Sequence, residues 1–88
     1  MNNQQAGVIL DDQVKHVRAK SFQELCQFIK APDVSKVSVY QVEINAMWDD
    51  QPNGNLRVIV SIDDGGRSAF MPMTADFIIS PSGSFIDE

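Results

Sequence analysis

The sequence predicts an α+β fold, in which an N-terminal helix packs on one face of a four- to five-stranded antiparallel meander sheet. Three observations predict it. Apolar and polar residues alternate along 40–48 and again along 56–62, and a period of two marks strands with one buried face. Turn-forming residues separate the strand-like runs. Residues 21–29 instead carry apolar side chains at helical spacing, which predicts a helix with one apolar stripe.

The length and composition indicate one small globular domain. The chain has 88 residues, and we expect 1–88 to fold as a single α+β domain with residues 1–7 as a disordered tail. The net charge of −5 and the scattered Lys and Arg residues argue against nucleic-acid binding, which needs a clustered basic surface. No apolar run approaches the roughly 18–20 residues of a membrane span. Because the first residues lack the features of a signal peptide, we expect a cytoplasmic protein.

The N-terminal part of the chain contains one clear helix and two undecided segments. Residues 8–10 form a short apolar run that fits an edge strand or a segment packed over the end of the sheet. Residues 13–20 fit either a helix or a strand, and helix is favoured. Ser21 and Glu24 match a capping box, in which each side chain accepts a hydrogen bond from the other residue's backbone. The apolar stripe that follows consists of Phe22, Leu25, Cys26 and Ile29.

The two central hairpins are predicted from the condition that all their apolar residues share one face. The first hairpin pairs Trp48 with Leu56, and the second pairs Ile62 with Arg67 around a four-residue loop at 63–66. A shift of one residue in either register would move every side chain to the opposite face. The agreement of the two hairpins therefore predicts one apolar inner face and one more polar outer face.

The sequence allows two interpretations at each end of the sheet. Val37 and Val39 are out of phase with the alternation that follows, which indicates a strand covered on both faces or a bulge. Residues 76–80 and 84–87 flank a short loop at 81–83 and predict a C-terminal hairpin. This hairpin could extend the sheet or fold over its outer face.

No catalytic, cofactor-binding or metal-binding pattern is recognisable, so we expect neither an enzyme nor a cofactor. Cys26 lies on the apolar stripe, where a cysteine behaves as a small core residue, and His16 is the only imidazole. Residues 49–54 resemble the start of a calcium loop, but Val60 occupies the position of the required glutamate. The glycine-rich run at 65–68 lacks the ending of a phosphate-binding loop.

The outer face of the sheet carries the predicted interface residues. The second hairpin makes Ile59 and Phe70 cross-strand neighbours, with Pro72 on the same face and Arg57 among the surrounding polar residues. Trp48 is a further candidate anchor, since tryptophan is enriched at binding hot spots, with a place in the core as the alternative.

Two functional hypotheses follow from the sequence. The first is a non-enzymatic protein-interaction module, a homodimer joined through the outer sheet face or an edge strand. The second is a small enzyme or ligand-binding subunit with a shallow site near the loop at 48–55. The acidic net charge adds a protein partner with a basic surface as a further alternative.

Overall fold

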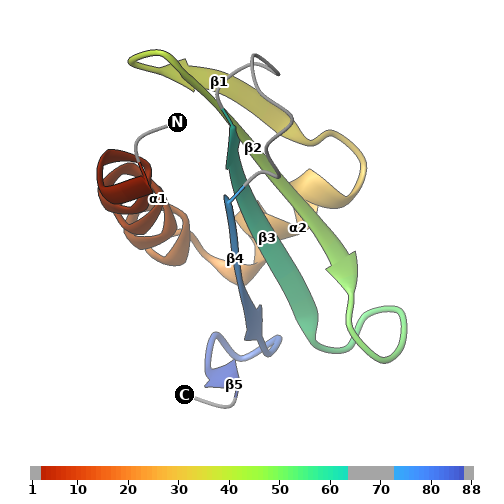
Figure 1. The fold of residues 1–88 in the computed structure, drawn as a ribbon. Coiled ribbons are helices and arrows are strands. Elements are labelled where there is room, and N and C mark those ends of the chain that lie inside the picture. The colour runs from red at the N-terminus through yellow and green to blue at the C-terminus, as the bar shows by residue number, and fades with distance from the viewer. Residues whose placement is uncertain (1–2, 64–72, 87–88) are drawn as a thin grey trace.

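The computed structural model describes residues 3–63 and 73–86. The described residues form two α-helices, a short 3₁₀-helix and one antiparallel sheet with strand order β1-β2-β3-β4-β5, which confirms the predicted α+β meander (Figure 1). The elements are α1 (Asn3–Arg18), α2 (Phe22–Cys26), η1 (Gln27–Ile29), β1 (Asp33–Val37), β2 (Tyr40–Trp48), β3 (Leu56–Asp63), β4 (Met73–Ile79) and β5 (Phe85–Ile86).

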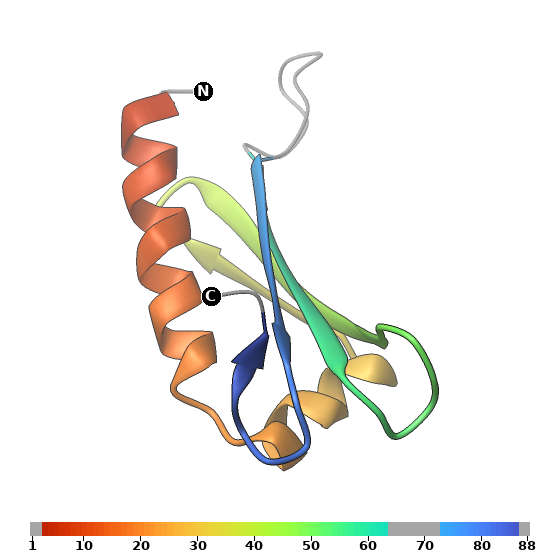
Figure 2. The ribbon, with the colours of Figure 1, turned by 90° about the horizontal axis from the view of Figure 1, so that it is seen from below.

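The helices and the sheet form two layers around one apolar core. Figures 1 and 2 show α1 and α2 on the same side of the sheet, and α1 contacts β3 and β4. The even-numbered residues of β2 and β3 face the helices, as their alternation predicts, and all are buried except Trp48, which is half-buried at the end of β2. The buried core consists of Ala6, Leu10, Val17, Leu25, Tyr40, Val42, Ile44, Ala46, Leu56, Val58, Val60, Ile62, Phe77 and Ile79.

One of the two predicted hairpin registers is confirmed and the other is wrong. Trp48 pairs with Leu56 as predicted. Ile62, however, pairs with Met73 instead of Arg67, a shift of six residues. An even shift keeps every side chain on its original face, so the alternation that predicted the inner face could not reveal the error.

The phase change before Tyr40 comes from a tight turn, and neither of the two sequence interpretations is correct. β1 ends at Val37 and pairs it with Tyr40, so only Ser38 and Val39 connect the two strands. Ser38 has a φ of 59°. This left-handed conformation is characteristic of two-residue hairpin turns. Val39 therefore belongs to the turn, where its side chain is exposed.

The prediction of a disordered tail is wrong for residues 3–7, because α1 begins at Asn3. Ala6, Leu10 and Val17 are buried on one side of this helix. Their separations of four and seven residues are helical, so one helix spans residues 8–10 and 13–18, for which the local patterns predict two separate segments. The helix favoured for residues 13–20 is confirmed as far as Arg18, and the edge strand considered for residues 8–10 is not formed.

The capping box predicted at the start of α2 is formed. The Glu24 backbone N–H donates to Ser21 Oγ at 3.2 Å, and the Ser21 backbone N–H donates to Glu24 Oε1 at 3.1 Å. The latter bond is the main reason that the pKa of the Glu24 carboxyl is lowered. Leu25 is fully buried one residue later, so the cap positions the apolar side of α2 on the sheet.

The predicted C-terminal hairpin is formed, and it extends the sheet beside β4. Ile78 pairs with Ile86 in β5. The connecting turn contains Gly83 at a φ of 92°. The Phe85 ring packs edge-on against Phe77 on the inner side, with ring centroids 5.6 Å apart. The Arg18 guanidinium lies 4.1 Å from the Phe85 ring centroid, which ties the hairpin to the end of α1.

Candidate functional site

The candidate interaction surface is the outer face, the side of the sheet opposite the helices. It is formed by the odd-numbered residues of β2 and β3 and the even-numbered residues of β4. These side chains are all partly or fully exposed, so no described element covers this face as a second layer. The residues that form its central part are Glu43, Asn45, Met47, Arg57, Ile59, Ser61, Thr74, Asp76 and Ile78.

The structure corrects the predicted pair of Ile59 and Phe70. Ile59 does lie on the outer face, but its neighbours are Asn45 on β2 and Asp76 on β4. Phe70 and Pro72 lie outside the described residues. Ile59 does not pair with Phe70 because the β3–β4 register is shifted by six residues, so that the residues from Met73 onward lie alongside β3.

The correct register brings together an apolar cluster that the sequence analysis missed. Met47 and Ile78 lie directly opposite Arg57 on its two sides. Ile86 follows Ile78 in the same row, and Ile59 is two residues along β3 on the same face. We call Met47, Ile59, Ile78 and Ile86 the outer apolar cluster. Alternation alone could not identify this cluster, because its members are recognised as neighbours only when the pairing partners of β4 are known.

Arg57 lies within this cluster and is held by two carboxylates. Its Nε and Nη2 donate to Asp49 Oδ1 at 3.2 and 3.0 Å, and its Nη1 donates to Asp76 Oδ2. The hydrogen bonds to Asp49 and then Asp76 raise the pKa of Arg57, which keeps the guanidinium charged. The three residues tie together the start of the β2–β3 loop, β3 and β4. The Arg57 side chain is consequently oriented before any partner binds.

This combination of side chains is suited to protein contact. A partly exposed arginine next to aliphatic residues, inside a polar rim, resembles the composition of binding hot spots. Fixing the arginine in advance lowers the conformational entropy lost on association. Within the described part of the chain, no group of three His, Cys, Asp or Glu residues could hold a metal ion.

Trp48 is separated from the other predicted interface residues. It is half-buried on the inner side at the end of β2, and its ring centroid lies 6.4 Å from that of Phe22 in α2. Arg57 and Ile59 face the opposite side of the sheet. The predicted interface therefore does not form one surface that includes Trp48.

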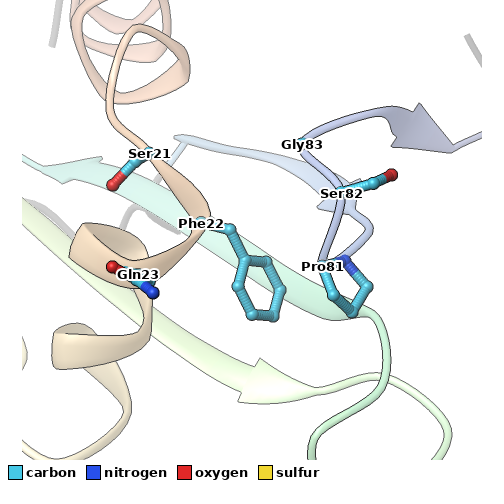
Figure 3. Close-up of a pocket in the computed structure, with 6 residues that line it drawn as sticks. All are labelled: Ser21, Phe22, Gln23, Pro81, Ser82 and Gly83. Carbon is cyan, nitrogen blue, oxygen red and sulfur yellow. The ribbon is translucent and has the colours of Figure 1, made fainter.

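A shallow cavity of about 300 Å³ lies on the Phe22 side of this aromatic pair. Figure 3 shows the rings of Phe22 and Pro81 across the space between the start of α2 and the β4–β5 turn. The lining residues are Ser21, Phe22, Gln23, Pro81, Ser82 and Gly83. Residues 48–55, near which the sequence predicts a shallow site, do not line this cavity, and Asp49 of that loop bonds to Arg57.

The two residues considered for nucleophilic chemistry lie in ordinary surroundings. Cys26 is half-buried and packs against the core, and burial raises the pKa of its thiol. A raised pKa disfavours the reactive thiolate. His16 is exposed on α1, with its Nδ1 2.8 Å from the Asp12 carbonyl oxygen.

Among the described residues, no helix has the length and apolar character needed to cross a membrane. No family model, curated protein or solved structure matches this chain.

Proposed function

We propose that this protein is a small non-enzymatic interaction module that forms a homodimer through its outer sheet face. The observation that supports the proposal most directly is the outer apolar cluster with Arg57 held inside it by Asp49 and Asp76. Exposed aliphatic side chains on a sheet lose unfavourable contact with water when a second sheet packs on them. The proposal includes a cytoplasmic location.

The outer face is a better candidate than the β1 edge. Pro32 precedes β1, and the strand itself carries Asp33 and Lys36, all three of them exposed. Proline and charged residues on an edge strand discourage pairing with another chain. The outer face instead presents exposed apolar side chains on neighbouring strands: Met47 has 49% of its surface exposed, and Val34, which pairs with Glu43 on this face, has 57%.

The size of the face limits the area of the proposed dimer contact. Four strands spaced by about 4.8 Å and seven residues long, at about 3.3 Å per residue, cover a flat area of roughly 440 Å². Side-chain relief adds accessible surface to this value, and a standard interface takes roughly 800 Å² from each partner. We therefore expect a contact of small area, whose affinity the concentration series must measure because buried area alone does not set it.

The test is the solution mass measured by light scattering across a concentration series at low and high salt. We expect a dimer that resists salt, because apolar contacts are not screened by ions. Ile59→Asp and Met47→Asp should each shift the protein to monomer. Val8→Asp and Val39→Asp are matched controls, because these exposed residues lie on α1 and on the β1–β2 turn, away from the outer face.

A monomer at every concentration would refute the proposal. The proposal would also be refuted if the Ile59→Asp and Met47→Asp variants formed dimers as tight as that of the unchanged protein. If the protein instead forms a salt-sensitive complex with a basic protein, the outer face binds that partner in place of a second copy of the chain. Such a partner would agree with the net charge of −5.

The ligand-binding hypothesis is the second candidate, and one observation favours it. The shallow cavity beside Phe22 is lined from two elements far apart in the sequence. Its lining residue Phe22 contacts Trp48, which precedes the loop at 48–55 where the sequence predicts a shallow site.

A further inference from the structure

The strand register arranges the outer face in rows of residues that lie side by side across the sheet. We call the row next to the β2–β3 loop the apolar row; it consists of Met47, Arg57, Ile78 and Ile86. The middle row follows and consists of Asn45, Ile59 and Asp76. The polar row is next and consists of Glu43, Ser61 and Thr74. Apolar side chains are therefore concentrated toward one end of the outer face.

The order of these rows restricts how a second copy can pack on the face. In an isologous dimer both copies use the same surface, and a two-fold axis relates them, here lying between the two sheets. When stacked sheets are aligned, this axis runs either along the strands or across them. An axis along the strands places each row on the same row of the second copy. An axis across the strands does so for one row only and exchanges the rows on its two sides.

An axis across the strands opposes groups that repel each other. If it passed through the apolar row, the two Arg57 guanidinium groups would face each other, and Ile59 would lie beyond the end of the second sheet. If it passed through the middle row, Asp76 would face Asp76 of the second copy. Like charges opposed at an interface weaken association. With the sheets at right angles, the apolar row would extend along the strands of the second copy and cover polar residues such as Asp76.

An axis along the strands, through the centre of the apolar row, opposes compatible groups. The row extends from β2 to β5, so its centre lies between β3 and β4. Met47 of each copy then packs on Ile86 of the other. The aliphatic carbons of Arg57 pack on Ile78 of the second copy. The two guanidinium groups are displaced sideways from each other, and no like charges of the three rows are opposed.

The other two rows fit the same arrangement. Ser61 faces Thr74 of the second copy, and each hydroxyl can donate or accept a hydrogen bond. Ile59 faces Asp76 of the second copy, whose carboxylate is bonded to Arg57 of its own chain. A charge that is already paired can be covered at lower cost than an isolated one. The bond between Arg57 and Asp76 therefore prepares the face for contact.

We propose that the second copy packs on the outer face about a two-fold axis that runs along the strands, between β3 and β4. This geometry rests on the proposed homodimer. It specifies which residues meet across the contact: Met47 with Ile86, Arg57 with Ile78, Ile59 with Asp76, and Ser61 with Thr74.

The test is chemical cross-linking of the full chain with single cysteines in a Cys26→Ala background, since Cys26 is the only native cysteine. Met47→Cys and Ile86→Cys lie at opposite ends of the apolar row, three strands and therefore about 14 Å apart. A bismaleimide that spans about 10 Å matches the spacing of stacked sheets. We expect an equimolar mixture of the two variants to give a covalent dimer that contains both chains, identified by mass spectrometry. Neither variant should cross-link alone.

Ser61→Cys provides a second readout outside the apolar row. With the proposed axis, the two copies of this residue are displaced sideways by only about one strand spacing, 4.8 Å, so the variant should cross-link alone. With an axis across the apolar row, they would be about 27 Å apart along the strand direction and should not react. Val39→Cys, on the exposed β1–β2 turn, is the control for random collision and should give no covalent dimer.

Light scattering of each variant before cross-linking separates this geometry from the homodimer itself. A dimer that cross-links through Met47→Cys alone or Ile86→Cys alone would refute the axis along the strands and leave the homodimer intact. A dimeric Ser61→Cys variant that does not cross-link would refute it as well. If Met47→Cys or Ile86→Cys prevents association, the Ser61→Cys result decides. A monomer at every concentration, in every variant and in the unchanged protein, would overturn both the geometry and the proposed function.

Discussion

Leu25→Ala tests whether α2 anchors the helical layer to the sheet. Leu25 is fully buried and belongs to the same core as the inner residues of β2 and β3. The substitution removes three carbon groups, which at ~0.8 kcal/mol for each buried CH₂ is a loss of ~2.4 kcal/mol. The cavity left behind raises the expected cost to roughly 3–5 kcal/mol. For a domain of this size each kcal/mol lowers the melting temperature by about 4–8 °C, so a decrease of at least ~12 °C is expected.

The assay is urea and thermal unfolding, followed by far-UV circular dichroism and by Trp48 fluorescence. Ala19→Gly is a useful reference, because Ala19 is exposed beyond the end of α1 and its replacement should cost less than about 1 kcal/mol. Leu25→Val, with a smaller expected loss, allows a measurement if Leu25→Ala is unfolded at 25 °C. A cost below about 1 kcal/mol for Leu25→Ala would refute the placement of α2 on the core.

Four further predictions concern local features. Ser21→Ala removes the side chain that accepts the Glu24 N–H and should lower the free energy of unfolding by about 1 kcal/mol, measured by urea denaturation. The pKa of Glu24 lies below its ordinary value of 4.5, so the stabilisation from its charge is present above that pH and is lost as the pH falls through the folded-state pKa. The stability difference from Glu24→Gln should therefore be constant near neutral pH and decrease in acid, and a difference independent of pH would contradict the capping bond. The raised pKa of the Cys26 thiol predicts slower alkylation at pH 7.5 in the folded protein than in urea, and equal rates would contradict its burial. Gly83→Ala should destabilise the β4–β5 hairpin by about 1 kcal/mol through backbone strain alone, because a Cβ there meets no atom within 4 Å, and an unchanged urea midpoint would contradict the φ of 92°.

The sequence alone determined the features that depend on neighbours along the chain. The alternation from Tyr40 onward assigned the inner and outer faces of β2 and β3. Ser21 and Glu24, three residues apart, determined where α2 begins. The short loop around Gly83 determined the C-terminal hairpin. Each feature arises from interactions within a few residues, which a local pattern records directly.

The extent of α1 was decided by tertiary packing. The first seven residues are polar and small overall, so their composition resembles that of a frayed tail. Ala6 is nevertheless completely buried, and the Tyr40 hydroxyl donates to Gln5 Oε1 at 3.3 Å from β2. The sheet thus provides contacts that extend the helix to Asn3, and a short segment read by itself contains no sign of them.

The candidate site depended on tertiary structure most of all. Alternation assigns the face of a side chain but not its partner, because every even shift of register preserves the pattern. Only the pairing of Arg57 with Met47 and Ile78 shows that aliphatic residues surround it. Its bonds to Asp49 and Asp76 join residues 8 and 19 positions away in the sequence. Residues so far apart meet only when the whole sheet has formed, and for this reason the sequence could indicate the surface but not its composition.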